Sequence, residues 1–317
     1  MRRGGYGRGS EGGACSETGH GDCLQMRVRQ HQGAGDREGS GDDQGTLHGN
    51  GRQLIAGEGM VSPHQQMFNL DGHVALVTGA SSGLGRRAAT VLAEAGADVI
   101  GVARRAEALA DWAAIGKDNV GGRRAALPAD LSDEAGVATM CETAQQTFGP
   151  PDILVHAAGV NMRQPAADVT PDSWNETQWL NLAAPFFISQ TLVPAMAEKG
   201  WGRIVNFASL QTTRAFPAGI AYGASKGGVG QMTRAMAEAW SADGINANAI
   251  GPGFFPTELT AAVFADEARS ARNAAQTCVG RNGRLEDIDG PILFLCSDAS
   301  AYVTGQILMV DGGFTAK

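Results

Sequence analysis

The sequence lacks a basic excess, a long apolar run and cysteines at metal-ligand spacing. Its 25 Lys and Arg residues are outnumbered by 33 Asp and Glu residues, which gives a formal net charge of −8 and argues against binding nucleic acid through phosphates. No apolar run approaches the ~20 residues of a membrane helix. The arginines near the start of the sequence are not followed by the apolar segment that a secretory signal contains. We therefore expect no nucleic-acid or membrane partner.

The cysteines are few and scattered along the chain. They are Cys15, Cys23, Cys141, Cys278 and Cys296, and no two have the spacing of a zinc or redox site. Free thiols are typical of a reducing compartment, so we predict a cytoplasmic protein.

The first 66 residues differ in composition from the rest. They hold four of the six histidines and a large share of the 45 glycines, with few large apolar residues. Such a segment buries too little surface to offset its ordering entropy, so we predict that residues 1–66 are disordered. Met60 and Met67 are both plausible starts of the natural protein, and a glycine-rich interaction tail is the functional alternative.

Residues 67–317 alternate short apolar runs with helical patterns, of which Gly83–Ala95, Glu134–Thr147 and Ala221–Ser241 are examples. This alternation predicts one α/β domain, a doubly wound parallel seven-stranded Rossmann sheet with helices on both faces. Ligands of such sheets bind at the carboxyl ends of the strands. The expected strands are Val74–Thr78, Val99–Ala103, Ala125–Asp130, Ile153–His156, Arg203–Ala208, Asn246–Ile250 and Gln306–Val310.

A glycine-rich turn joins the first expected strand to a helix. Gly79 allows a tight turn, Gly83 lets the backbone approach a pyrophosphate, and Gly85 lets the helix pack close to the strand. The helix N-terminus adds free N–H donors and a partial positive charge. Because the motif follows a strand and opens a helix, it predicts a dinucleotide site rather than a plain turn.

The end of the second expected strand bears on the choice of dinucleotide. Ala103 stands where NAD enzymes of this fold commonly carry an acid, and Arg104 follows it. A guanidinium there can pair with a 2′-phosphate, which favours NADP over NAD. The alternative is that Arg104 and Arg105 simply begin a solvated helix.

Tyr222 and Lys226 lie four apart at the start of a helix and so share one face. A phenol with its ordinary pKa of ~10 is a poor base at neutral pH. A unit charge ~4 Å away at an effective dielectric constant of ~20 is worth about 4 kcal/mol. We therefore expect Lys226 to lower the pKa of Tyr222, which then exchanges a proton with a carbonyl or alcohol oxygen.

Two further polar residues precede this pair. Ser209 lies thirteen residues before Tyr222, just past an expected strand, and Asn181 lies in an apolar helical segment where an amide needs partners. Taken singly, each residue has an ordinary structural explanation.

In their order and spacing, these features closely resemble the short-chain dehydrogenase/reductase family. The resemblance covers about residues 68–317 and includes the glycine turn Thr78–Gly85, Asp130, Asn181, Ser209, Tyr222 with Lys226, and Pro252-Gly253. It implies a catalytic tetrad in which Tyr222 is the acid/base, Ser209 orients the carbonyl, Lys226 binds the nicotinamide ribose, and Asn181 holds a water on a proton path.

The resemblance also implies a bound NADP, with NAD as the weaker alternative, and no metal. The residues expected around this cofactor are Gly79, Ser81, Ser82, Gly83, Leu84, Gly85, Arg104, Arg105, Asp130, Leu131, Ala157, Ala158, Gly159, Tyr222, Lys226, Pro252, Gly253, Phe255 and Thr257. His156 stands where the family usually has Asn, and we interpret it as a structural replacement.

The substrate is expected to meet the loops after the fourth, fifth and sixth strands. Candidate contacts are Arg163, Gln211, Arg214 and Phe254, with the two arginines suited to a carboxylate; solvated arginines on a loop rim are the alternative. The segment Asn161–Pro165 and the Val310-Asp-Gly-Gly313 end are similar to the branch with gluconate 5-dehydrogenases. That branch implies a sugar-acid or polyol substrate, with 3-oxoacyl-carrier-protein reduction as the alternative.

Two broader expectations follow from the resemblance. The family is commonly tetrameric, so a homotetramer is expected, with helices around Trp179–Lys199 and Ala221–Ser241 between subunits. A non-catalytic dinucleotide-binding protein is the remote alternative, because such a protein is expected to lose Tyr or Lys and this chain keeps both.

Overall fold

The seven apolar runs form seven parallel strands in the computed structural model, which describes residues 62–115 and 121–317. The spatial order is β3-β2-β1-β4-β5-β6-β7, so the predicted doubly wound parallel sheet is confirmed. The bounds of the strands are β1 Val74–Thr78, β2 Asp98–Ala103, β3 Arg124–Pro128, β4 Ile153–His156, β5 Gly202–Phe207, β6 Ile245–Pro252 and β7 Ile307–Val310.

Two strands, β3 and β6, end two residues away from their predicted limits, and β5 ends one residue early. β3 stops at Pro128, and Asp130 lies in the following turn, where its carboxylate accepts a hydrogen bond from the Ser132 amide at 3.0 Å. β6 continues to Pro252 because its last residue still pairs with Val310 of β7. Both differences arise from pairing and turn contacts that a local apolar pattern does not contain.

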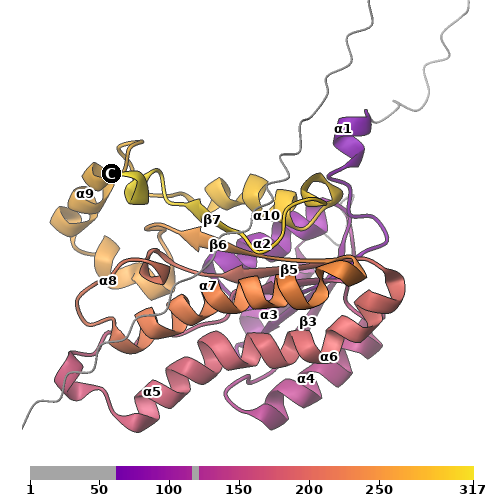
Figure 1. Cartoon of the computed structure of the whole chain (residues 1–317), viewed down its shortest axis with the longest axis horizontal. Coiled ribbons are helices and arrows are strands. Elements are labelled where there is room, and N and C mark those ends of the chain that lie inside the picture. Colours follow the sequence, from indigo (N-terminus) through magenta and orange to yellow (C-terminus); the bar gives the residue numbers. More distant parts are fainter. Residues whose placement is uncertain (1–61, 116–120) are drawn as a thin grey trace, which may run out of the picture. The chain divides into compact units, whose positions relative to one another are not determined.

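Helices cover both faces of the sheet (Figure 1). On one face α2, α3 and α10 enclose a core that includes Leu92, Trp112 and Ile292. On the other, α4, α6 and α7 enclose a second core that includes Met140, Ile188 and Met236. The bounds of the longer helices are α2 Gly83–Glu94, α3 Ala106–Ala114, α4 Glu134–Thr147, α5 Pro171–Gln178, α6 Ala184–Lys199, α7 Ile220–Trp240, α9 Glu267–Gln276 and α10 Asp289–Leu295.

The strand order reverses at β1, and this point locates the site. β1 pairs with β2 on one side and with β4 on the other, and Thr78 stands opposite both Val102 and His156. The chain leaves these strands at the same level, so the loops after β1, β2 and β4 open into one crevice. The short helix α8 (Ala261–Phe264) and α9 follow β6 at the same end of the sheet (Figure 1).

The predicted disorder of residues 1–66 falls almost wholly on residues that lie outside the described part of the chain, as do Cys15 and Cys23. The described part begins earlier than expected, since Pro63–Gln66 form the short helix α1. The Ser62 hydroxyl accepts from the Gln65 amide, and the Gln65 side chain accepts from the Ser62 amide. This reciprocal cap is the reason that a polar segment starts a helix there.

One helical stretch in the described residues, Pro171–Lys199, is long and apolar enough by length and composition to be considered as a membrane span. The stretch is this long because α5 and α6 run on through one π-helical turn, η2 (Trp179–Ala183), and it is not an uninterrupted apolar run. Its apolar residues pack against α4 and α7, as those of a core helix do.

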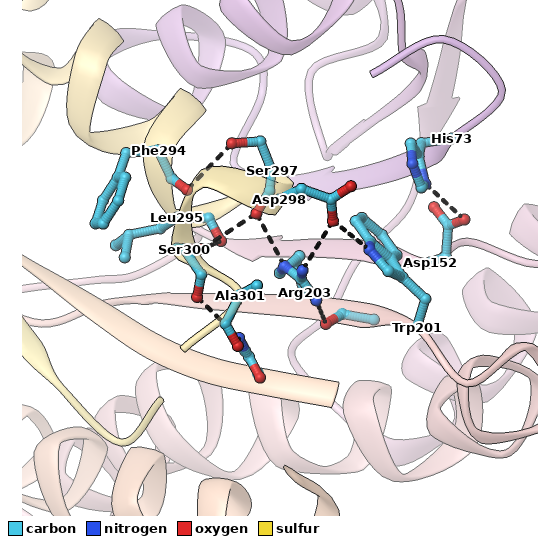
Figure 2. Close-up of polar contacts among 12 residues, drawn as sticks. His73, Asp152, Trp201, Arg203, Phe294, Leu295, Ser297, Asp298, Ser300 and Ala301 are labelled. Carbon is cyan, nitrogen blue, oxygen red and sulfur yellow. Dashed lines mark hydrogen bonds and ion pairs between the residues drawn. The ribbon is translucent and has the colours of Figure 1, made fainter. Parts of the chain in front are cut away.

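The amino-terminal edge of the sheet carries a polar network of its own (Figure 2). Arg203 of β5 is buried and donates to the Ser297 carbonyl at 3.1 Å and to the Asp298 carboxylate at 3.2 Å. Trp201 covers the guanidinium and donates to the same carboxylate at 2.8 Å. His73, stacked on Trp201, reaches Asp152 at 3.0 Å. The network ties β1, β4 and β5 to the segment before β7.

Candidate active site

The turn after β1 has the geometry of a phosphate cradle. Gly79 and Gly83 have φ angles of 73° and 55°, which L side chains rarely adopt. A Cβ at Gly85 would lie 2.4 Å from the Gly79 carbonyl oxygen, so only glycine lets α2 approach this turn. Ser82 is the N-cap of α2 but makes no side-chain cap bond. The first N–H groups of α2 therefore stay available to an anion.

This cradle opens into a cavity of about 660 Å³ at the carboxyl ends of the strands. Every residue expected around the cofactor lines it, from the glycine turn to the segment after β6. The Thr78 hydroxyl accepts a hydrogen bond from the Ala158 amide at 3.2 Å, which joins the loop after β4 to the cradle. The shape, the glycines and the free donors fit a dinucleotide.

The two arginines after β2 differ in their surroundings. Arg104 is exposed and makes no side-chain hydrogen bond or ion pair with any described residue. Arg105 donates to the hydroxyls of Ser81 and Ser82 and forms an ion pair with Glu258, at 2.7 Å. The alternative that both merely begin a solvated helix therefore does not describe Arg105, which is bound to the cradle.

Tyr222, near the start of α7, lies on the same cavity as Ser209. Its side chain is partly open to the cavity, yet desolvation by the surrounding protein raises the pKa of the phenol. Two smaller effects lower that pKa: a hydrogen bond with the Ser209 hydroxyl and the positive charge of Arg163. At neutral pH Tyr222 is thus a protonated acid, and it lies on the same cavity as the serine expected to share its substrate oxygen.

The expectation that Lys226 lowers the pKa of Tyr222 was wrong for this structure. The Lys226 ammonium donates to the Phe207 carbonyl at 2.6 Å and lies 5.7 Å from the centre of the Tyr222 ring. Burial also lowers the pKa of Lys226 itself to about 8. Spacing placed the two side chains on one face correctly, but it did not show that the backbone of β5 would bind the ammonium.

Asn181 is buried behind the cavity rather than on its wall. It sits in the π-helical turn η2, where its amide oxygen accepts from the Val160 N–H at 2.8 Å. Its amide nitrogen donates to the Val160 carbonyl and to the Ser225 hydroxyl. The extra residue in the turn directs this side chain to the loop after β4, and all its polar atoms are bonded.

The four expected substrate contacts separate into two groups. Arg163, Gln211 and Phe254 line the cavity, whereas Arg214 does not and instead donates to the Lys317 main-chain oxygen. Arg163 has a φ of 52° and reaches across to the Leu259 carbonyl at 2.9 Å. The loop after β4 thus contacts the segment after β6 over the cavity.

His156 has the structural position expected of it. It is buried at the end of β4, and one ring nitrogen lies 3.0 Å from the Ser189 hydroxyl of α6. Desolvation lowers its pKa to about 3, so the ring is neutral at physiological pH. A neutral ring tying the sheet to α6 has no part in the proton chemistry of Tyr222.

Glu258 and Ser225 were not among the residues predicted for the site. Glu258 bridges Arg105 and Ser82 across the mouth of the cavity, and Ser225 holds the amide of Asn181. Ser225 stands between Tyr222 and Lys226, which was a usable hint. Glu258 follows Thr257, but its partner lies 153 residues away, and no local signal reports such a contact.

Comparison with known proteins gives consistent matches. The family model described as enoyl-(acyl carrier protein) reductase matches residues 79–315. The chain is 38% identical to gluconate 5-dehydrogenase of Gluconobacter oxydans (strain 621H) over 254 residues, 80% of this chain and 99% of the relative. It is 40% identical to 2-dehydro-3-deoxy-D-gluconate 5-dehydrogenase of Dickeya dadantii (strain 3937) over 256 residues, 79% and 98% of the two chains.

A more distant relative and a solved structure extend the picture. The 3-oxoacyl-[acyl-carrier-protein] reductase of Escherichia coli (strain K12) is 34% identical over 249 residues, 78% of this chain and 98% of the relative. The crystal structure of a gluconate 5-dehydrogenase from Burkholderia cenocepacia J2315 in complex with NADP and tartrate is 36% identical, with a TM-score of 0.75, and the match covers 80% of this chain and 99% of that one. Together with the confirmed fold, these matches show that the chain is an oxidoreductase of the short-chain dehydrogenase/reductase family.

Proposed function

We propose that the protein is an NADP(H)-dependent oxidoreductase that interconverts a secondary alcohol and a ketone on a sugar acid. One observation carries the proposal: Tyr222, Ser209 and Lys226 share a single cavity with the glycine cradle and with Arg163. The relatives named as dehydrogenases of gluconate and of 2-dehydro-3-deoxy-D-gluconate support the substrate class. The related structure with NADP bound supports the cofactor.

The cofactor and the site residues have separate roles in the reaction. When bound, the nicotinamide supplies hydride to the carbonyl carbon or accepts it from the alcohol carbon. Tyr222, protonated because burial raises its pKa, donates its proton to the carbonyl oxygen during reduction. The Ser209 hydroxyl, which lines the same cavity, holds the same oxygen in place. In oxidation the deprotonated Tyr222 takes the proton of the alcohol, and the positive charge of Arg163 is the one that favours the phenolate.

The polar groups on the cavity wall suit an anionic substrate. The guanidinium of Arg163 has no carboxylate partner among the described residues and its charge acts on Tyr222. A substrate carboxylate bound there would place a polyhydroxy chain beside the Tyr222 oxygen. Gln211 and Phe254 supply one polar and one apolar contact on the same wall.

The decisive test of the chemistry is Tyr222→Phe. Removing only the phenolic oxygen should lower kcat by roughly 10²- to 10⁴-fold, the usual contribution of a positioned acid/base. The dissociation constant for NADPH, measured by quenching of protein fluorescence, should change little. A variant that reduces substrate at the wild-type rate would exclude Tyr222 from proton transfer.

The substrate class is tested with a panel of gluconate, 5-ketogluconate, 2-dehydro-3-deoxygluconate and acetoacetyl thioesters. We expect turnover of a sugar acid with NADP(H) and slow reaction of the thioesters. Fast thioester reduction without sugar-acid turnover would favour 3-oxoacyl reduction instead, which the 34% identical reductase supports. Binding of NADPH with no turnover of any of them would leave the non-catalytic alternative.

We further propose a homotetramer in the cytoplasm, the arrangement expected from the family resemblance. The exposed aromatic side chain of Phe187 lies in α6, within one of the two helical stretches expected between subunits, and the exposed Trp174 lies in α5 just before that stretch. Multi-angle light scattering of the purified chain should give about four times the chain mass of 32.8 kDa. A monomer would exclude the tetramer without affecting the proposed chemistry.

A further inference from the structure

Three segments that are remote in sequence meet at the mouth of the cofactor cavity. Glu258 lies in the short 3₁₀ helix η5 (Glu258–Thr260), and Arg105 and Ser82 occupy the N-cap positions of α3 and α2 without a side-chain cap bond. The Arg105 guanidinium donates to the Glu258 carboxylate at 2.7 Å and to the Ser82 hydroxyl at 2.8 Å. The Ser82 hydroxyl in turn donates to the second carboxylate oxygen at 3.1 Å. The three side chains thus form a closed cluster.

The donors of this cluster have the chemistry of an anion site. Arg105 also donates to the Ser81 hydroxyl at 3.0 Å, so one guanidinium joins the end of β2 to the cradle. The Ser82 hydroxyl donates to Glu258 and makes no cap bond to α2. The N-terminus of α2 therefore still attracts negative charge. The carboxylate of Glu258 therefore occupies donors of the kind that bind phosphate oxygens.

The position of the cluster indicates which phosphate it meets. It stands at the carboxyl end of β2, the place that receives the adenosine ribose in this fold. Arg104, with no partner among the described side chains, lines the same part of the cavity. A 2′-phosphate bound beside Arg104 therefore faces the guanidinium of Arg105 and the carboxylate of Glu258 together.

Resting on the proposed use of NADP(H), we infer that Glu258 is a specificity-determining residue that competes with the 2′-phosphate for Arg105 and Ser82. It weakens NADPH binding relative to NADH. NADPH still binds, because the side chains of Arg105 and Glu258 are 51% and 64% exposed and an exposed ion pair is readily exchanged for a phosphate of higher charge. NADH carries no 2′-phosphate and leaves the pair undisturbed.

The test is Glu258→Gln, with dissociation constants for NADPH and NADH measured by fluorescence titration at low ionic strength. Loss of the competing charge should tighten NADPH binding by about two- to fivefold, the range that exposed ion pairs allow. NADH binding should stay within error of the wild type. In an Arg105→Ala background, where the contested donor is gone, Glu258→Gln should give a smaller gain than in the wild type.

Glu107→Gln is the matched control. It removes one exposed acidic charge two residues from Arg105, from a side chain that does not line the cavity. It should leave both constants unchanged. Unchanged or weaker NADPH binding by Glu258→Gln, or equal tightening of NADPH and NADH binding, would overturn this inference but not the proposed function. A wild-type protein that binds neither dinucleotide would overturn the proposed function and the inference with it.

Discussion

His156 shows how burial of a single residue converts into dependence of stability on pH. The folded protein keeps the ring neutral, with a pKa that burial lowers to about 3 from its ordinary value of 6.5. As pH falls below about 6.5 the unfolded chain takes up a proton that the folded protein does not. Stability therefore falls with decreasing pH through this window, with a limiting slope of ~1.36 kcal/mol per pH unit for one proton.

His156→Asn isolates this contribution, because Asn can bond to Ser189 without titrating. Between pH 6 and pH 4.5 the free energy of unfolding should fall by about 1–2 kcal/mol less in the variant than in the wild type. Urea denaturation at both pH values measures the difference, in which the carboxyl groups common to both proteins cancel. Equal losses in the two proteins would show that His156 is protonated in the folded state.

For single residues, the sequence predicted the location of the site side chains better than it predicted their pKa shifts. Tyr222, Ser209 and Lys226 were predicted from spacing, and all three line one cavity. The shift of the Tyr222 pKa had the wrong sign, because desolvation depends on what the rest of the chain packs around a group. The cation that does lower it, Arg163, comes from a different loop.

At the scale of elements, the cradle and α2 form one unit whose spacing is set by Gly85. Gly85→Ala would place a Cβ 2.4 Å from the Gly79 oxygen and 3.2 Å from the Ala157 side chain. Both neighbours are held by the sheet, so α2 must move away and its N-terminal donors move with it. We expect NADPH to bind at least ~10-fold more weakly, equivalent to ~1.4 kcal/mol.

Gly290→Ala is the control for this substitution. Gly290 lies in α10, and a Cβ there meets no atom within 4 Å. Alanine should raise stability by about 0.5–1 kcal/mol, the usual difference between the two residues within a helix, and leave the NADPH dissociation constant unchanged. If both alanine variants bind NADPH like the wild type, close approach of α2 to the turn is not what positions the cofactor.

Most elements were predictable because their signals are local. Continuous apolar runs gave the strands, and the glycine turn gave the start of α2. The π-helical turn η2 was not predictable, because the residues Trp179–Ala183 have an ordinary helical pattern. The insertion is stabilised by bonds from Asn181 to Val160 and Ser225, which come from other elements.

Across the whole molecule, the two ends of the sheet differ in their chemistry. The carboxyl ends carry the cavity with its glycine turn, Ser209 and Tyr222, whereas the amino ends carry the network around Arg203 and Asp152 (Figure 2). The cavity must exchange ligands, and the opposite edge holds the strands in register. This division predicts that stability and cofactor binding can be changed separately.

Arg203→Met tests the separation. Methionine keeps apolar contact with Trp201 but removes the bonds to the Ser297 carbonyl and to Asp298, so that the Ser297 carbonyl keeps only its bonds from Ser300. Bonds to a charged, buried group contribute more than neutral ones, so we expect a loss of about 2–4 kcal/mol in the free energy of unfolding. The NADPH dissociation constant at 25 °C should stay at the wild-type value, because the cavity does not include Arg203.

Arg123→Met is the matched comparison, since Arg123 also lies over an aromatic ring, that of Phe148, and also pairs with an aspartate, Asp98. It differs in being exposed, with 65% of its side chain accessible, so its loss should change stability little. A large loss in both variants would mean that pairing with aspartate matters more than burial. Weaker NADPH binding in Arg203→Met alone would mean that the two ends of the sheet are coupled, because the substituted side chain touches only the amino-terminal edge.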